Sequence, residues 1–251
     1  MTMQYKKTSI IRNDRVSSNI FRMTVHEEQA ANIVPGQFYL VKLVDKSPLL
    51  ARPLSIYRVD QQTVSFLYAV VGEGTDKLSR LQVDDQLYIT GPLGNGFDIA
   101  KLSGKVAMVS GSVGVAPFIE LKRRLQAKQI TLYAGFSSEP YGLDEFSDID
   151  QIIVATDDGS YGHHGFITDC FQPELFDVVV TCGPEALMQK VIAACSAVSV
   201  PVFASMDKRM ACGIGACLVC SCKTVAGYKR CCVDGPVFSG QELELEADGD
   251  A

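Results

Sequence analysis

The chain has 251 residues, of which 47% are hydrophobic, 21% charged and 8% aromatic. This is the composition of an ordinary globular protein, and it excludes global disorder, a coiled coil and a collagen-like chain. A formal net charge of −6 argues against nucleic acid as a partner, because neutralising phosphates takes clustered Lys and Arg.

The N-terminal segment gives no sign of export. Residues 1–7 lack the apolar stretch and the small-residue cleavage site of a secretory signal. No window approaches the roughly 20 consecutive apolar residues that cross a bilayer. We therefore expect a cytoplasmic protein that makes no membrane contact. In that compartment thiols stay reduced, so clustered cysteines hold metal more often than they form disulfides.

Residues 1–100 predict a small antiparallel β-barrel. Short runs rich in β-branched and aromatic residues alternate there with turn residues such as Pro35-Gly36 and Gly91-Pro92. Several strands at this spacing are typical of such a barrel. The strands are expected at Thr8–Ile11, Ile20–Val25, Phe38–Val44, Leu54–Val59, Val64–Val71 and Gln86–Thr90.

One segment of the barrel carries a candidate phosphate site. The run Arg52-Pro53-Leu54-Ser55 opens a predicted strand, and Val71-Gly72-Glu73-Gly74-Thr75 follows a later one. An Arg and a Ser beside a glycine-bearing helix start can bind a pyrophosphate through charge and backbone amides. From the pattern alone, a salt bridge and a plain turn explain these residues at least as well.

Residues 101–202 predict a parallel α/β sheet. Short continuous apolar runs are typical of strands buried on both faces, and their alternation with helices indicates a parallel sheet. In the first helix Glu120 is placed to pair with Arg124. The strands are expected at Val106–Ser110, Ile130–Ala134, Ile152–Ala155 and Val178–Thr181, and the helices at Val115–Lys128 and Pro184–Ala197.

Two turns at strand ends in this region are candidate ligand sites. Val109–Pro117 carries glycines between a buried strand and a helix, where free amides and the helix dipole favour a phosphate. It is not the full G-x-G-x-x-G fingerprint, and a tight structural turn is the alternative. Thr181-Cys182-Gly183-Pro184 ends another strand, where open α/β sheets bind ligands. A small buried cysteine at a turn is the alternative there.

Residues 203–251 hold six of the nine cysteines. Cys212, Cys217 and Cys220 follow the spacing C-x4-C-x2-C, and together with Cys232 they match the plant-type [2Fe–2S] pattern. Glycines between the first two let a loop bend closely around a compact cluster. Structural zinc and free buried thiols are the alternatives, but zinc sites usually pair two C-x2–4-C knuckles, and a second knuckle with a partner is missing.

Six cysteines compete for four ligand positions. Cys222 lies on the predicted strand Val219–Val225 and shares a face with Cys220 if that strand begins early enough. Cys231 and Cys232 are adjacent and point in opposite directions, so only one of them can face a cluster. Spacing alone does not choose between them.

The order of these motifs resembles the ferredoxin–NADP reductase superfamily, and more closely the electron-transfer subunits of NAD-dependent (class 1B) dihydroorotate dehydrogenases. Its most specific segments are residues 91–97, 156–162, 209–217 and 232–238. The resemblance implies a multidomain α+β protein with three modules. These are an FAD-binding β-barrel (1–100), an NAD-binding α/β domain (101–202) and a [2Fe–2S] module (203–251).

The resemblance also implies roles for individual residues. The implied FAD contacts are Arg52, Pro53, Leu54, Ser55, Tyr68, Ala69, Val70, Gly74 and Thr75. The implied NAD contacts are Gly111, Gly114, Ala116, Pro117, Cys182 and Gly183. The implied cluster ligands are Cys212, Cys217, Cys220 and Cys232, because the family's fourth ligand precedes x-Asp-Gly-Pro. The chain departs from the family at Ser112, where a second glycine is usual, and at Cys222 and Cys231, where a thiol is not.

The implied activity is electron transfer in pyrimidine biosynthesis, from a dihydroorotate-oxidising FMN subunit through the cluster and FAD to NAD⁺. FAD must lie in the middle, because a cluster carries single electrons, nicotinamide takes a hydride, and flavin handles both. No side chain is expected to act as a catalytic acid or base. The chain is expected to need the FMN-containing catalytic subunit, in a heterotetramer of two of each. The alternatives are a reductase subunit for a hydrogenase or glutamate-synthase-type partner, and a zinc-stabilised interaction module.

Overall fold

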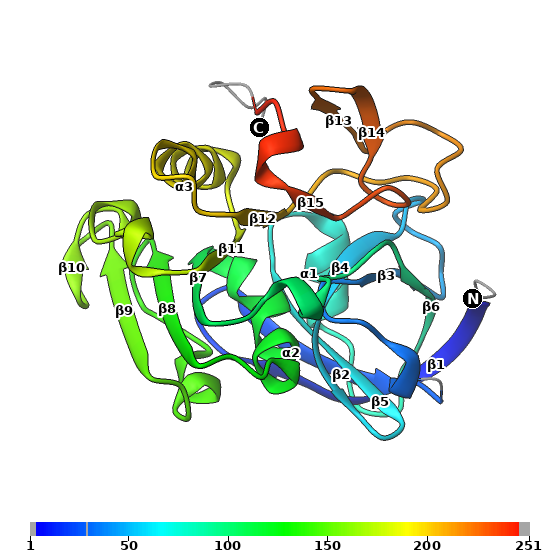
Figure 1. Ribbon diagram of the computed structural model, residues 1–251. Coiled ribbons are helices and arrows are strands. Elements are labelled where there is room, and N and C mark those ends of the chain that lie inside the picture. The colour runs from blue at the N-terminus through cyan, green and yellow to red at the C-terminus, as the bar shows by residue number, and fades with distance from the viewer. Residues whose placement is uncertain (1–3, 29, 246–251) are drawn as a thin grey trace.

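The first part of the chain forms a closed barrel with the strand order β1-β2-β5-β4-β3-β6 (Figure 1). The computed structural model describes residues 4–28 and 30–245. Every strand predicted for this part overlaps one of the observed strands. They are β1 (Gln4–Arg15), β2 (Ile20–His26), β3 (Phe38–Leu43), β4 (Arg52–Asp60), β5 (Thr63–Ala69) and β6 (Gln86–Leu93).

The barrel closes around a core of apolar side chains from its strands. In β6, Leu87 and Ile89 enter this core two positions apart, as the two-residue period of a strand requires. The short helix α1 (Glu73–Ser79) follows β5 and inserts Leu78 into the same core. The barrel core therefore fills from its own strands and from the segment that carries the glycine run after β5.

The second part of the chain is a seven-stranded sheet with the order β10-β9-β8-β7-β11-β12-β15. Its strands are parallel except β15, which runs antiparallel to β12. The strands are β7 (Lys105–Gly111), β8 (Gln129–Phe136), β9 (Gln151–Thr156), β10 (His163–His164), β11 (Val178–Cys182), β12 (Val202–Ser205) and β15 (Val237–Ser239). The parallel sheet and the barrel confirm the predicted fold class.

Helices cover both faces of this sheet, which explains the continuous apolar runs of its strands. In β7, Met108 belongs to the core cluster of Phe118 from α2 (Ala116–Arg124), whereas Val109 belongs to the cluster of Val191 from α3 (Glu185–Ala197). The helix α2 ends before the predicted Lys128. Backbone hydrogen bonds from Lys128 and the next residue to the Gly104 carbonyl draw the chain to the start of β8 instead.

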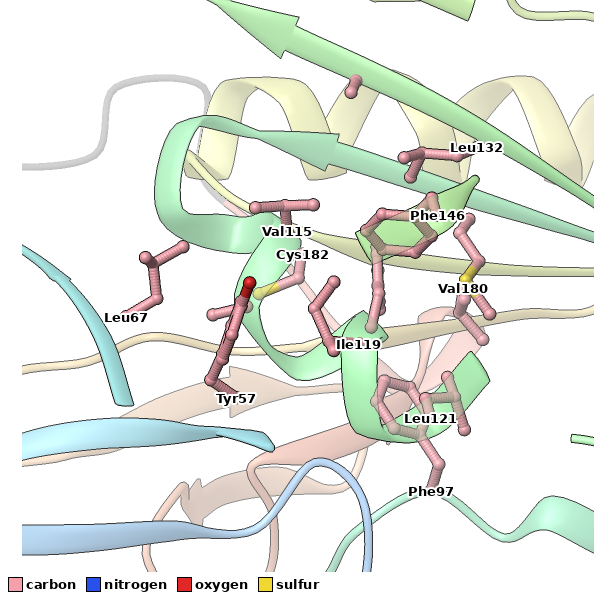
Figure 2. Close-up of a cluster of buried hydrophobic side chains, with 14 of the residues drawn as sticks. Tyr57, Leu67, Phe97, Val115, Ile119, Leu121, Leu132, Phe146, Val180 and Cys182 are labelled. Carbon is pink, nitrogen blue, oxygen red and sulfur yellow. The ribbon is translucent and has the colours of Figure 1, made fainter. Parts of the chain in front are cut away.

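One apolar cluster joins the barrel to the sheet (Figure 2). Tyr57 and Leu67 from the barrel lie in this cluster with Val115 and Cys182 from the second part. A polar contact fixes the same boundary, since the buried Glu120 of α2 accepts a hydrogen bond from the Val59 amide of β4 at 3.1 Å. The two parts thus share a core as well as a hydrogen-bonded edge.

The cysteine-rich segment lies beside the barrel and returns to the sheet (Figure 1). It contains the hairpin β13 (Ser221–Thr224) and β14 (Gly227–Arg230), and β15 then pairs with β12. Cys220 and Cys231 are buried with Leu40 and Leu93 of the barrel strands β3 and β6. Short 3-10 helices lie at Ala30–Asn32, Ile99–Lys101, Ser112–Val115, Leu143–Phe146, Ile167–Asp169, Pro173–Leu175 and Gly240–Glu242.

Candidate functional site

Two turns at the carboxyl edge of the sheet pack on each other. An added Cβ on Gly114 would lie 2.2 Å from the Cys182 carbonyl oxygen, and one on Gly183 would lie 2.8 Å from the Gly111 nitrogen. Only glycine allows these backbones to approach so closely. The structure therefore brings together Gly111, Gly114, Cys182 and Gly183, which the sequence placed in two separate motifs.

The turn after β7 runs directly into α2. Gly111 ends the strand, residues 112–115 form a 3-10 turn, and α2 begins at Ala116 with Pro117 in its first turn. Proline suits that position, since its missing N–H would have had no partner within the helix. Ser112 has a φ of 53°, and its hydroxyl lies 3.0 Å from the hydroxyl of Tyr141. Sequence reasoning missed Tyr141, which belongs to the loop after the neighbouring strand β8.

The thiol of Cys182 is held in its neutral form. Burial and the nearby Asp207 carboxylate raise the pKa of Cys182 to about 12, while a hydrogen bond with Ser205 opposes the shift. Cys182 and Ser205 are paired at the ends of β11 and β12. Desolvation also raises the pKa of the Asp207 carboxyl, although the residue as a whole is solvent-exposed. A neutral buried thiol lines a site without acting as a nucleophile.

A second constellation lies at the start of β4 and of α1. An added Cβ on Gly74 would lie 2.5 Å from Nε of Arg52, so the guanidinium rests against the glycine at the beginning of α1. The Arg52 guanidinium also donates to the Leu50 carbonyl. The Thr75 hydroxyl accepts hydrogen bonds from the amides of residues 71 and 72, at 3.0 and 3.2 Å. Arg52, Gly74 and Thr75 thus lie together at the start of α1.

The other barrel residues implied as FAD contacts differ in where their side chains pack. Leu54 is buried in the barrel core, while Pro53 and Ser55 on either side of it are half-buried. Tyr68 is also buried in that core, and its hydroxyl bonds Asn13 at 3.1 Å. Of the two half-buried residues that follow, Ala69 packs against the cluster that contains Cys182, whereas Val70 packs against the same barrel core as Tyr68.

The six clustered cysteines form three side-chain pairs. All six are free thiols, and they lie as neighbours: Cys212 with Cys217, Cys220 with Cys232, and Cys222 with Cys231. Among residues 4–28 and 30–245, no three side chains of the metal-binding types converge on one point. The four cysteines of the C-x4-C-x2-C…C pattern make up two of these three pairs.

Backbone amides point at two of these sulfurs. The amides of Ile214 and Cys217 donate to Cys212 Sγ, both at 3.4 Å, and the Gly215 amide donates to Cys232 Sγ at 3.2 Å. Partial desolvation raises the pKa of Cys212, but the hydrogen bonds from these amides outweigh it and lower the pKa to about 6. Burial and contact with Cys220 raise the pKa of Cys232 to about 12. The loop can therefore stabilise negative charge on sulfur through its own amides.

Glycines and one arginine hold the cysteine loop in place. Gly213 and Gly215 have φ values of 70° and 77°, and an added Cβ on Gly213 would lie 2.6 Å from Leu40 of β3. Arg230 donates to the Gly215 carbonyl at 3.3 Å and to the Asp234 carboxylate at 3.0 Å. The loop is thereby fixed against the outside of the barrel, a contact that the spacing of the cysteines did not reveal.

Apolar side chains surround the exposed end of the loop. Cys217 is exposed, whereas Cys220 and Cys232 are buried. Five large apolar side chains of the same module are about half exposed or more: Ile214 (49%), Leu218 (61%), Val219 (55%), Val225 (67%) and Tyr228 (77%). Exposed apolar side chains grouped in this way mark an interaction surface. Within the described residues, no helix is both long and apolar enough to cross a membrane.

Comparison with known proteins finds relatives along the full length of the chain. The sequence model of the iron–sulfur cluster binding domain of dihydroorotate dehydrogenase B matches residues 207–244. The dihydroorotate dehydrogenase B (NAD(+)) electron transfer subunit of Clostridium acetobutylicum is 46% identical, covering 98% of this chain and 99% of that protein. The subunit of the same name from Clostridium perfringens is 43% identical, covering 98% and 100%.

Solved structures show the same architecture. The NADH-dependent reduced ferredoxin–NADP oxidoreductase, described for flavin-based electron bifurcation, superposes with a TM-score of 0.84 at 27% identity, covering 95% of this chain and 90% of that one. A ferredoxin NADP⁺ reductase from Neisseria gonorrhoeae, solved with FAD and NADP, shares the fold with a TM-score of 0.62 at 12% identity, covering 78% and 91%.

Proposed function

The chain belongs to the family of dihydroorotate dehydrogenase B (NAD(+)) electron transfer subunits, and from this premise we propose how its residues carry electrons to NAD⁺. It is an oxidoreductase subunit that passes electrons from a dihydroorotate-oxidising partner through a [2Fe–2S] cluster and FAD to NAD⁺. The observation that carries the proposal is the cysteine loop packed on the barrel, with backbone amides that point at the sulfurs of Cys212 and Cys232.

The proposed cluster ligands are Cys212, Cys217, Cys220 and Cys232. Their arrangement as two sulfur pairs supports this set, as do the amides that point at Cys212 and Cys232. Cys231 is left out because its thiol bonds Cys222 instead. Four cysteine sulfurs at this spacing are the donor set of a plant-type two-iron cluster, and the iron–sulfur domain model that matches residues 207–244 supports the same choice.

The proposed FAD contacts lie on the barrel. Arg52, Gly74 and Thr75 would hold the phosphates, since the guanidinium rests on the helix start and Thr75 fixes that start. Leu54 and Tyr68 point into the barrel core, so we propose that they contribute through their backbones. Pro53, Ser55, Ala69 and Val70 complete the set. Bound FAD supplies the conversion between single-electron and hydride transfer.

The proposed NAD contacts lie at the carboxyl edge of the sheet. They are Gly111, Gly114, Ala116, Pro117, Cys182 and Gly183, and the close packing of the two glycine turns supports their common role. The loops after β8 and β9 (137–142 and 157–162) carry Glu139, Asp157 and Asp158 and no Lys or Arg. A 2′-phosphate would find no cationic partner there, which supports NAD over NADP.

The two proposed sites are neighbours. Ala69 of the FAD set packs against the apolar cluster that contains Cys182 of the NAD set. In the same cluster Tyr57 and Val115 stand on the two sides of the boundary (Figure 2). The neutral thiol of Cys182 and the apolar side chains around it exclude water from the boundary. Exclusion of water there protects a hydride donor and its acceptor from side reactions.

An electron transfer subunit of dihydroorotate dehydrogenase B works together with a catalytic subunit of the same enzyme. We propose that this partner carries FMN, that the complex contains two of each chain, and that it resides in the cytoplasm. The exposed apolar side chains of residues 214, 218, 219 and 228 support docking of the partner beside Cys217. Electrons would then enter at the exposed end of the cluster and leave toward the barrel.

Co-purification with the catalytic subunit tests this function. The complex should contain FAD, FMN, iron and labile sulfide, and it should reduce NAD⁺ when dihydroorotate is added. The isolated chain should keep FAD and the cluster but should not oxidise dihydroorotate. A colourless protein with stoichiometric zinc would overturn the cofactor assignment, and an inactive complex that holds all the cofactors would overturn the dihydroorotate assignment.

A further inference from the structure

Ser112 adopts a backbone conformation that serines avoid. Its φ of 53° lies in the left-handed region, where Cβ crowds the following carbonyl. Glycine reaches this region freely, but a serine stays there only when its surroundings hold it. Ser112 lies between Gly111 and Gly114, in the turn that we propose for the phosphates of NAD. Whatever holds Ser112 therefore also shapes that turn.

The hydroxyl of Tyr141 is in position to do so. It lies 3.0 Å from Ser112 Oγ, and no other hydrogen bond of the Ser112 side chain occurs among the described residues. The Tyr141 ring stands edge-on to Phe136, with centroids 4.8 Å apart and planes at 68°. Phe136 is buried in the core shared by the sheet and the barrel. Tyr141 is thus anchored on a rigid part of the protein.

The hydrogen bond joins two loops of the candidate ligand edge. Gly111 and Gly135 are paired at the ends of the parallel strands β7 and β8, and the loops that follow carry Ser112 and Tyr141. Ligands of open α/β sheets bind across such neighbouring loops. A hydrogen bond between the two loops restricts their motion before a ligand binds. Less conformational entropy is therefore lost on binding.

We propose that Tyr141 is a positioning residue for the dinucleotide: its hydroxyl holds Ser112 in the left-handed conformation and so keeps the Gly111–Gly114 turn ready for a pyrophosphate. The inference rests on the proposed function, because it assumes that NAD⁺ binds this turn. It assigns no proton transfer to Tyr141, and it accounts for a serine where the family usually has a glycine.

Binding of NAD⁺ to the full-length, FAD-loaded protein tests the proposal. The dissociation constant is measured by calorimetry and by the change in flavin absorbance, and KM and kcat are measured in the complex with the partner. Tyr141→Phe should raise the dissociation constant about fivefold, which corresponds to about 1 kcal/mol, the usual net value of a hydrogen bond. KM should rise by a similar factor while kcat stays unchanged. Tyr5→Phe, at an exposed tyrosine of β1, is the matched control.

Substitutions at Ser112 separate positioning from a direct contact of Tyr141 with NAD⁺. Ser112→Ala keeps the Cβ that disfavours the left-handed conformation and loses the bond, so it should match Tyr141→Phe, and the double variant should be no weaker than either single variant. Ser112→Gly removes the need for support, so Tyr141→Phe should have no effect in that background. An equal effect of Tyr141→Phe in both backgrounds would overturn the proposal, as would unchanged affinity in the wild-type background.

Different results would contradict the positioning role of Tyr141 and the proposed binding of NAD⁺. If the wild-type protein binds NAD⁺ and Tyr141→Phe binds it as tightly, the positioning role falls and the proposed function stands. If the wild-type protein with FAD and cluster bound does not bind NAD⁺ at all, the acceptor assignment and this inference fall together.

Discussion

The thiol of Cys231 hydrogen-bonds Cys222, whereas Cys232, the next residue along, turns its sulfur to Cys220. Cys231 donates its backbone amide to the Cys220 carbonyl at 3.0 Å, which continues the β13–β14 ladder by one residue. Cys231 and Cys232 lie in the turn that follows β14, where the amides of residues 233 and 234 donate to the Arg230 carbonyl, and this turn directs the two sulfurs to different partners. The spare thiols thus form a pair of their own behind the proposed ligands.

Replacing the adjacent cysteines separately should give opposite results. Cys232→Ser should lose the visible absorption and the reduced-state electron paramagnetic resonance signal of the cluster, because one iron loses a thiolate. Cys231→Ser should keep both, since only the bond to Cys222 is lost. Iron and sulfide analysis of the two purified proteins provides the check. A cluster that survives Cys232→Ser but not Cys231→Ser would reverse the assignment.

Removing the guanidinium of Arg52 should weaken FAD retention. The proposed phosphate contact is charge-assisted, so Arg52→Ala should raise the FAD dissociation constant about tenfold or more. Gly74→Ala should act in the same direction, because its Cβ would fall 2.5 Å from Nε of Arg52. Arg80→Ala, at the exposed end of α1, is the control. An unchanged flavin-to-protein ratio in both variants would contradict the contact.

Glu120 should matter for stability far more than a surface carboxylate does. It is 2% exposed, bonds Arg123 at 2.9 Å and Arg124 at 2.7 Å, and accepts the Val59 amide across the boundary of the barrel. Since the arginines are about a third exposed, we expect Glu120→Ala to cost about 2–3 kcal/mol, below the range for a fully buried pair. Asp98→Ala removes an exposed pair and should cost under about 0.5 kcal/mol. Urea unfolding followed by circular dichroism compares the two, and equal losses would refute the difference.

Alkaline pH should destabilise the fold through its buried thiols. Burial and the Asp207 carboxylate raise the pKa of Cys182 to about 12, and burial alone raises the pKa of Cys195 to about 12. Both thiols remain protonated in the folded state above pH 9, where the unfolded chain releases those protons. Stability is therefore fully present below about pH 9 and is lost as pH rises toward 12.

The size of this loss can be measured. As the pH rises from about 8 to about 9.5, each thiol should lower the free energy of unfolding by about 0.8 kcal/mol. Cys195→Ala should lower stability at all pH values but flatten the slope of unfolding free energy against pH by that amount. A slope identical to that of the wild-type protein would show that the Cys195 thiol ionises as easily in the folded state as in the unfolded one.

The barrel and the central sheet could be predicted because their signal is local. Residues 106–109 of the sheet are apolar throughout since helices cover both faces, and barrel strands such as Gln86–Leu93 alternate in burial. The strand β10 could not be predicted, because the exposed His163–His164 has no apolar pattern and pairs only with the end of β9. The strand β15 joins the sheet as its edge through three residues near the end of the chain.

The candidate site could be predicted as motifs but not as an arrangement. The pairing of Glu120 with Arg124 follows from helical spacing, whereas its bond to the Val59 amide depends on how α2 docks on the barrel. Ser112 was visible as a departure from a glycine, but Tyr141 lies in a different loop and carries no motif. The choice among six cysteines likewise depends on the turn after β14, which spacing does not encode.

The central claim is that the cluster is the electrical link between the catalytic partner and FAD. The direct test is dihydroorotate-dependent NAD⁺ reduction by the complex that carries Cys232→Ser. The account predicts that this activity is lost. The same complex should still oxidise dihydroorotate with an artificial acceptor and should still oxidise NADH with an artificial acceptor at FAD. Wild-type rates of NAD⁺ reduction in a complex shown to lack the cluster would contradict the account.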